Sequence, residues 1–274
     1  MKHAILMTVY KDAPLVNRII ASYPLDFPIF VHIDKKSEIQ KHDIITRPNL
    51  YIEKSMKVNW GGYHHVLAML SLLEKALKTN ADYYHWVTGQ DIPLSPERFD
   101  ERINEGYSYL EYFPLPREGW CEGGLIRYQI YGLYDLLDAK KPRQFRWIQK
   151  IEKIQKKYHF VRPFRNYSNI YAGSGYFSLY KTDASLLFKE SSKWHKFYRF
   201  TFCGEESIAQ TILLNSNRKD YIINNNLRYI DWSASVPPKI LDLDDYEKIA
   251  TTQCLFCRKV DSVISKGLLV KYGI

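Results

Sequence analysis

The sequence predicts an α/β protein with a mostly parallel central sheet and helices on both of its faces. Two observations support this fold class: short apolar runs alternate with helical patterns over the first third of the chain, and the composition is that of a globular protein. The chain has 274 residues, of which 46% are hydrophobic and 25% charged. A chain of this length can bury a core without disulfides, and the βαβα order favours a parallel sheet. We expect one continuous domain.

The first predicted unit is a helix between two strands. Apolar runs at residues 4–9 and 29–33 predict buried strands. Between them, Asp12 is suited to cap a helix that carries Pro14 in its first turn and runs toward Tyr23. A further short strand is expected near residues 51–52.

The clearest helical pattern covers residues 63–78. Its apolar residues recur at i, i+3, i+4 and i+7 spacing, at Val66, Met69, Leu70, Leu73, Ala76 and Leu77. A strand is expected next at residues 83–87, ending before a turn at residues 89–93. Later strands are predicted at residues 107–113 and 176–180, where the order of elements is less regular.

Three of these strands reach their carboxyl ends at residues 8–11, 34–37 and 88–91. The carboxyl ends of parallel strands lie along one edge of a sheet, and ligands of open α/β sheets bind beyond that edge. The sequence therefore predicts the binding site at this edge.

The positive charge of the chain is concentrated in one segment. Residues 140–165 contain ten Lys or Arg residues and one acidic residue, Glu152, so their formal charge equals the +9 of the whole chain. The segment also has apolar residues at helical spacing, namely Trp147, Ile151, Ile154 and Tyr158. The pattern predicts a basic amphipathic helix, which could lie on an anionic membrane surface. A solvated helix with its apolar stripe on the core fits equally well, and nucleic-acid binding is a weaker interpretation because no nucleic-acid motif is present.

Missing motifs argue against simple interpretations as a dehydrogenase, a P-loop NTPase, a zinc protease or a serine hydrolase. The chain contains no G-x-G-x-x-G, Walker A, H-E-x-x-H or G-x-S-x-G sequence. Its four Cys are too few for a disulfide scaffold, and Cys254 and Cys257 form a lone C-x-x-C that we interpret as structural. The start of the chain lacks the apolar length of a signal peptide, and no stretch approaches the roughly 20 apolar residues of a membrane span. We therefore expect a soluble protein of the cytoplasm.

Sequence blocks distributed over the chain carry the functional signal. They are residues 31–37, Trp60-Gly61-Gly62 with the following helix and the turn at 88–93, residues 173–177, residues 205–211, residues 230–232 and residues 256–259. In this order and spacing the blocks resemble the core-2/I-branching N-acetylglucosaminyltransferase family, glycosyltransferase family 14, which also holds the peptide O-xylosyltransferases. The resemblance runs from the first strand to about residue 260.

The resemblance implies a GT-A type fold and an inverting transfer from a nucleotide sugar without a metal ion. An Asp-x-Asp pair would normally hold a divalent ion on the donor diphosphate, whereas the matching position here reads Gly89-Gln90-Asp91, with one carboxylate. We therefore expect neither a metal nor another cofactor. Arg258 and Lys259 match the family's basic pair, in which Arg binds phosphate oxygens in bidentate fashion and Lys adds a point charge.

Glu206 matches the family's catalytic carboxylate. Inversion at an anomeric carbon needs one base that takes the acceptor hydroxyl proton while the oxygen attacks opposite the diphosphate. The family usually has Asp before this Glu, whereas this chain has Glu205. The downstream match at Gln210-Thr211 favours Glu206 as the base. Both carboxylates would also suit the first turn of a helix, where they complement the helix dipole.

The other site residues are predicted from their places in the blocks. Asp34 and Tyr10 follow two strands and are expected near the nucleoside, although Asp34 also suits a turn. Contacts to the donor or acceptor sugar are expected from Trp232, Asp91, Glu122 and Arg127. The indole of Trp232 could stack on a sugar ring, and a position in the core is its alternative.

These matches predict transfer of a sugar, N-acetylglucosamine in the first place, from a UDP-sugar to a glycan hydroxyl. UDP-xylose, UDP-galactose and UDP-glucuronic acid are alternative donors. A non-catalytic carbohydrate- or nucleic-acid-binding protein is the alternative from another class, although we expect no nucleic-acid partner. Residues 1–105 would form the nucleotide-binding half and residues 106–274 the acceptor-binding and catalytic half.

Compared with anchored animal members of the family, the chain looks like a compact bacterial version. This likeness suggests assembly of a surface polysaccharide on a lipid-linked oligosaccharide at the inner face of the plasma membrane. In that setting the basic segment at residues 140–165 would dock on anionic lipid beside the acceptor.

Overall fold

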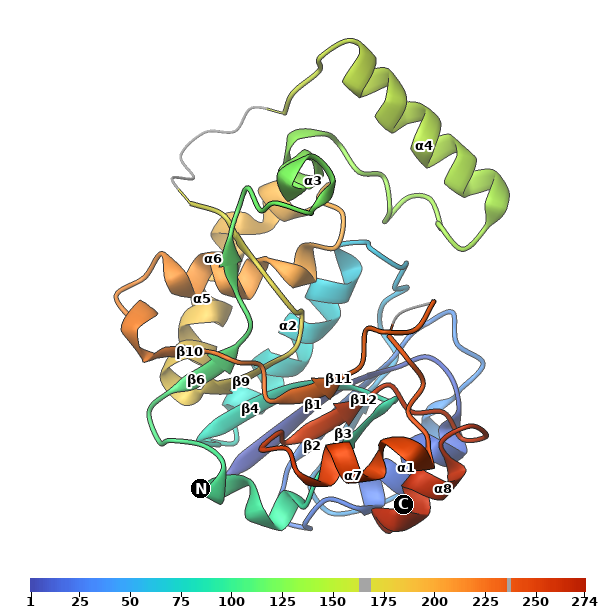
Figure 1. Cartoon of the computed structure of the whole chain (residues 1–274), viewed down its shortest axis with the longest axis vertical. Helices are drawn as coiled ribbons and strands as arrows, with labels where there is room; N and C mark the ends of the chain where they lie inside the picture. The colour runs from blue at the N-terminus through green and yellow to red at the C-terminus, as the bar shows by residue number, and fades with distance from the viewer. Residues whose placement is uncertain (163–168, 236–237) are drawn as a thin grey trace.

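The computed structural model describes residues 1–162, 169–235 and 238–274. Its central sheet has the strand order β10-β6-β9-β4-β1-β2-β3 (Figure 1). The strands are β1 His3–Val9, β2 Ile29–Ile33, β3 Leu50–Glu53, β4 Tyr83–Thr88, β6 Ser108–Leu110, β9 Phe177–Tyr180 and β10 Ile222–Asn224. Among the described strands of this sheet, only β9 runs antiparallel to its neighbours. The predicted mostly parallel sheet is therefore confirmed.

Helices cover both faces of the sheet, as predicted. Alternate residues of β1 enter two different cores, because Ile5 and Met7 pack on one face and Ala4 and Leu6 on the other. The first face is covered by α1 Ala13–Ala21, α7 Tyr246–Ala250 and α8 Lys266–Lys271, and the second by α2 His64–Leu77, α5 Lys181–Tyr198 and α6 Ile208–Leu214. Strands buried on both sides appear as continuous apolar runs, which is why β1 and β2 are recognisable in the sequence.

Two smaller sheets connect distant parts of the chain. One consists of β11 Arg228–Ile230, β12 Phe256–Arg258 and β5 Asp91–Pro93, and the other of β7 Phe113–Pro114 and β8 Tyr171–Ala172. Strand β12 pairs antiparallel with β5, so that Arg258 lies opposite Asp91. The basic dipeptide near the end of the chain is thereby brought to the turn after β4.

One predicted strand is wrong in its extent. Residues 107–113 form two strands, β6 and β7, that belong to different sheets. Between them the backbone N–H of Tyr112 donates to the side chain of Asn224 at 2.8 Å instead of continuing a strand ladder. Hydrophobic alternation alone does not reveal this change of partner.

The basic segment forms helix α4, Pro142–Lys157, which lies at the end of the molecule away from the central sheet (Figure 1). Pro142 occupies its first turn, where the missing N–H has no cost. The short helix α3, Ile126–Gln129, precedes it. Residues 163–165 of the predicted basic segment lie outside the described residues. None of the helices in the described ranges combines the length and apolar character that a membrane crossing requires.

Candidate functional site

The carboxyl ends of β1, β2 and β4 form the predicted edge of the sheet. Val9, the last residue of β1, pairs with Ile33, the last residue of β2. The backbone N–H of Asp34 then donates to the Val9 carbonyl at 2.9 Å. Tyr10, Asp34 and the turn that carries Asp91 therefore follow strands that end side by side.

Asp34 and Tyr10 both remain accessible at this edge. One oxygen of Asp34, Oδ1, accepts the backbone N–H groups of Lys36 at 2.9 Å and Val58 at 3.1 Å, which fits the alternative interpretation as a turn residue. The side chain of Asp34 is nevertheless only half-buried. Tyr10 is exposed, and its hydroxyl donates to Gln90 Oε1 at 3.2 Å. Both side chains therefore border the edge where a nucleoside is expected.

Arg258 is held between Asp91 and Tyr176. Its Nε lies 2.8 Å from Asp91 Oδ1, and its guanidinium carbon lies 4.0 Å from the centre of the Tyr176 ring. The other oxygen of Asp91 accepts the Thr88 backbone N–H at 2.5 Å, and Asp91 is 1% exposed. Asp91 thus forms a buried ion pair with Arg258, and its predicted contact to a sugar hydroxyl stays a prediction.

Lys259 lies next to this arginine in a cationic environment. Burial lowers the pKa of Lys259, and the nearby charges of Arg258 and Lys11 lower it further. Three cations that repel one another form a site that an anion would stabilise. Their position at the sheet edge is consistent with the predicted diphosphate site.

Glu205 and Glu206 lie where separate sequence blocks meet. They form the short 3-10 turn that precedes α6. The backbone N–H of Gly173 donates to the Glu206 carbonyl at 2.8 Å. A Cβ atom on Gly175 would lie 3.3 Å from Glu205 Cγ, so the chain passes close to this side chain. Residues 173–175, which read Gly-Ser-Gly, thus pack against one side of the turn that carries the two carboxylates.

A second block supports the same turn from the other side. The backbone N–H of Cys203 donates to the Gly61 carbonyl at 2.9 Å. Gly61 has a φ of +74°, and a Cβ atom there would clash with the Phe202 ring at 2.4 Å, so this position requires glycine. The Trp-Gly-Gly block is therefore explained by close packing against the turn before the carboxylates.

Glu206 forms an ion pair with Arg127, whose Nη1 lies 2.6 Å from Glu206 Oε2. Burial raises the pKa of Glu206 above its usual value, the charge of Glu205 raises it further, and Arg127 opposes both effects. The Glu206 side chain is still 35% exposed. An accessible carboxylate with a raised pKa is a better proton acceptor near neutral pH than an ordinary one.

Glu205 has a different environment. Its Oε1 lies 3.6 Å from His65 Nδ1, and its side chain is 14% exposed. His65 also packs against Trp86, with ring centres 5.1 Å apart. His65 was not predicted, because nothing in the sequence distinguishes it from its neighbour His64 at the start of α2. Glu206 is therefore the more accessible carboxylate of the pair.

A cavity of about 460 Å³ opens beside Arg127. Its walls include the aromatic residues Trp120, Tyr134 and Phe202 and the charged residues Arg127, Glu152 and Lys156. The Tyr134 hydroxyl donates to Glu152 Oε1 at 3.1 Å. Flat apolar rings combined with a few charged hydrogen-bonding groups are suited to a sugar.

The remaining two predicted sugar-binding residues lie at more exposed positions. Glu122 pairs with Lys156 at 2.5 Å, and Lys156 in turn lines the cavity. Trp232 follows β11 and is 62% exposed, which excludes the alternative position in the core. The structure thus brings Arg127 and Glu206 together and leaves Trp232 on a surface loop.

In the ranges with described placement, no three His, Cys, Asp or Glu side chains gather in an arrangement that could hold a metal ion.

The fold and the site together define an α/β protein with a cationic sheet edge and a pair of carboxylates beside an aromatic cavity. Residues 133–251 match the family model of the Core-2/I-Branching enzymes, which confirms the family resemblance over this part of the chain. The match indicates glycosyltransferase activity, with a sugar donor and a glycan acceptor. It includes Glu206 and Trp232 but neither Asp34 nor Arg258. No curated protein matches the chain.

Proposed function

We propose that the protein is an inverting glycosyltransferase that transfers N-acetylglucosamine from its UDP derivative to a glycan hydroxyl. The observation that carries this proposal is the accessible Glu206, which has a raised pKa and is paired with Arg127 at an aromatic cavity. The family match supports the reaction class. The donor sugar and the stereochemistry come from the resemblance.

Glu206 acts as the general base. Its carboxylate takes the proton of the acceptor hydroxyl while that oxygen forms a bond to the anomeric carbon. The bond between this carbon and the diphosphate oxygen breaks on the opposite face, and its electron pair leaves with UDP. Attack from the opposite face inverts the configuration at the anomeric carbon. Arg127 orients the carboxylate and keeps it ionised between turnovers.

Arg258 and Lys259 stabilise the departing diphosphate. Asp91 binds the Nε side of Arg258, and Tyr176 covers one face of the guanidinium, so the remaining N–H groups are oriented before the donor arrives. Fixed cations at the leaving group can replace a divalent ion. Because Arg258 and Thr88 engage both oxygens of Asp91, we propose that the transfer needs no metal.

The acceptor occupies the cavity beside Arg127, where its sugar ring packs on the aromatic walls. Trp232 adds a second stacking surface from its loop. The biological acceptor in this proposal is a lipid-linked oligosaccharide used for bacterial surface polysaccharide, and the enzyme works at the inner face of the plasma membrane. UDP-xylose, UDP-galactose and UDP-glucuronic acid are the donors to compare with UDP-N-acetylglucosamine.

Titration of UDP into the purified protein by calorimetry, first with EDTA and then with manganese, tests the donor site. We expect binding in EDTA that the Arg258→Ala/Lys259→Ala variant loses. Binding that requires manganese would contradict metal independence. The absence of binding in both conditions would contradict the UDP-donor assignment and favour a non-catalytic carbohydrate-binding protein.

A further inference from the structure

Helix α4 presents an apolar stripe to solvent. Trp147 is 56% exposed, Ile154 47% and Tyr158, which caps the helix, 71%. The buried residues of α4 are Ile148 and Gln155. The interpretation that the predicted stripe packs on the core is therefore wrong for these three residues.

A row of cations lies beside this stripe. Arg143, Lys150 and Lys157 recur every seven residues, so they lie on one side of an α-helix, adjacent to the row that contains Trp147 and Ile154. All three are exposed, and no carboxylate in the described part of the chain forms an ion pair with them. The ammonium of Lys150 lies 5.0 Å from the centre of the Trp147 ring.

The opposite side of α4 is fixed to the protein. The side-chain amide of Gln155 exchanges two hydrogen bonds with the backbone of Tyr131, at 2.8 and 3.0 Å. Glu152 accepts the Tyr134 hydroxyl, and Lys156 pairs with Glu122. These contacts fix the rotation of the helix about its axis and leave the aromatic and cationic face outward.

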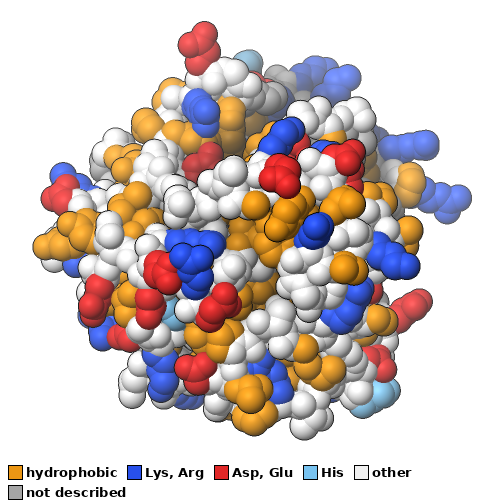
Figure 2. Space-filling model, turned by 60° about the horizontal axis from the view of Figure 1, so that its bottom comes forward, with side chains coloured by type: hydrophobic (Ala, Val, Ile, Leu, Met, Phe, Trp, Pro, Cys, Tyr) orange, Lys and Arg blue, Asp and Glu red, His pale blue; other side chains and the backbone are white. Residues whose placement is uncertain are grey.

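The charge of the rest of the molecule is balanced. On the face in Figure 2, acidic and basic side chains are interspersed among apolar ones. The formal charge of residues 140–165 equals that of the whole chain, +9. A partner that recognises α4 should therefore be anionic and should also accommodate Trp and Ile side chains.

We infer that this outward face of α4 docks on an anionic lipid membrane. Trp147, Ile154 and Tyr158 would enter the boundary between headgroups and acyl chains, as amphipathic interfacial helices do. Lys150 and Lys157 would extend their ammonium groups to the lipid phosphates, with their methylene stems along the apolar surface. Nucleic acid would satisfy the cations but offers no apolar layer for Ile154.

Docking in this way has a consequence for the cavity. Glu152 and Lys156 belong to the same helix and line the cavity beside Arg127. If the proposed glycosyltransferase function holds, the helix would bring that cavity next to the membrane, where a lipid-linked acceptor resides. Membrane docking itself does not depend on that function.

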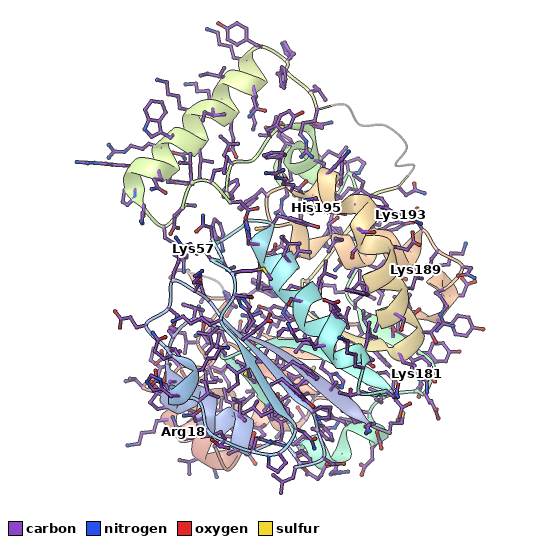
Figure 3. The ribbon with its side chains drawn as sticks, turned by 180° about the vertical axis from the view of Figure 1, so that it is seen from behind. Arg18, Lys57, Lys181, Lys189, Lys193 and His195 are labelled. Atoms are coloured by element: carbon purple, nitrogen blue, oxygen red, sulfur yellow. The ribbon has the colours of Figure 1, made fainter. Side chains whose placement is uncertain are left out.

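Sedimentation of the full-length protein with vesicles tests the inference. One set of vesicles contains phosphatidylcholine with about a third phosphatidylglycerol, and the other contains phosphatidylcholine alone. Three variants separate the contributions: Arg143→Gln/Lys150→Gln/Lys157→Gln, Trp147→Ser/Ile154→Ser, and a control with Lys189→Gln/Lys193→Gln/Lys196→Gln on α5. Figure 3 shows Lys189 and Lys193 along α5, on a different side of the molecule from α4. Lys156 is left intact because it lines the cavity.

We expect the wild type and the α5 control to bind anionic vesicles equally. Each cation near an anionic surface contributes about 1 kcal/mol, so the triple α4 variant should bind about a hundredfold more weakly. The Trp147→Ser/Ile154→Ser variant should bind at least about tenfold more weakly, because it loses apolar burial. Acyl chains that carry a bromine quencher should reduce the fluorescence of the wild type more than that of a Trp147→Phe variant.

Three results would overturn the inference. The first is that the wild type does not bind anionic vesicles. The second is that the α4 and α5 triple variants bind equally well. The third is that the wild type binds a polynucleotide more tightly than vesicles and the Trp147→Ser/Ile154→Ser variant binds vesicles normally. UDP titration of the same samples reports separately on the donor site, so failure of the proposed function would be recognised independently.

Discussion

Arg127 and Glu205 act on the proposed base in opposite directions. Arg127 pairs with Glu206 and lowers its pKa, whereas the charge of Glu205 raises it. The acid limb of the pH profile of kcat/KM reports the pKa of the free enzyme's base. Arg127→Gln should therefore move this limb to higher pH, and Glu205→Gln should move it to lower pH.

The size of the shift follows from the geometry. Two unit charges about 4 Å apart interact by about 4 kcal/mol at an effective dielectric constant of about 20. A solvent-exposed pair contributes only about 1 kcal/mol or less. The side chains of Arg127 and Glu206 are 22% and 35% exposed, which places the pair between these limits. We expect a shift of about one pH unit for Arg127→Gln, since one unit corresponds to about 1.4 kcal/mol.

Release of UDP in the presence of an acceptor, measured between pH 4.5 and 8.5, provides the profile. Arg98→Gln is a suitable control, because Arg98 pairs with Glu101 at the same 2.6 Å distance on an exposed surface. The control should keep the wild-type profile. Shifts of Arg127→Gln and Glu205→Gln in the same direction, or no shift in either, would refute the assignment of Glu206 as the titrating base.

Three further predictions concern packing and electrostatics. Asp91→Asn should weaken UDP binding about tenfold in calorimetry, because Arg258 loses its buried ionic partner; unchanged affinity would show that Arg258 needs no such support. Gly173→Ala should lower the free energy of unfolding in urea by about 1–3 kcal/mol, since the new Cβ would lie 2.0 Å from the Glu111 carbonyl oxygen; an unchanged midpoint would contradict this. Burial holds the pKa of His85 well below its usual value. At mildly acidic pH the unfolded chain therefore binds a proton at His85, whereas the folded chain does not. Stability should therefore fall as the pH drops below about 6.5, and a flat urea midpoint between pH 8 and 5 would be the contrary result.

The fold was predictable where burial produces a simple pattern. Strands β1 and β2 are buried on both faces, so they appear as uninterrupted apolar runs. The split of residues 107–113 was not predictable, because a change of pairing partner leaves no mark in local hydrophobicity. The pairing of β5 with β12 joins segments far apart in sequence, and no local pattern reveals it.

The site was predictable only in part for the same reason. The family resemblance predicted Glu206 and Arg258 as site residues. The structure adds their ion-pair partners, Arg127 and Asp91. Arg127 reaches Glu206 across 79 positions, and Asp91 reaches Arg258 through strand pairing. Asp91 was predicted to contact a sugar, and its buried ion pair with Arg258 was not visible in the sequence. His65 was not predicted, because the sequence does not show which of the adjacent residues His64 and His65 contacts Glu205.

The orientation of α4 illustrates a further limit of sequence patterns. The spacing of Trp147 and Ile154 predicts an apolar stripe without indicating what covers it. In the structure a polar residue, Gln155, occupies the buried side, because its amide pairs with the backbone of Tyr131. These two hydrogen bonds, together with the burial of Ile148, set the rotation of the helix, and the spacing of apolar residues does not indicate the hydrogen bonds.

The central claim is that Glu206 removes the acceptor proton during sugar transfer from a UDP-sugar. Its most direct test compares Glu206→Gln with the wild type in EDTA, measuring UDP affinity by calorimetry and transfer to an acceptor glycoside. We predict unchanged UDP affinity and transfer slower by a factor of about 10² to 10⁴, the usual contribution of a general base. Transfer at the wild-type rate by Glu206→Gln would contradict the claim.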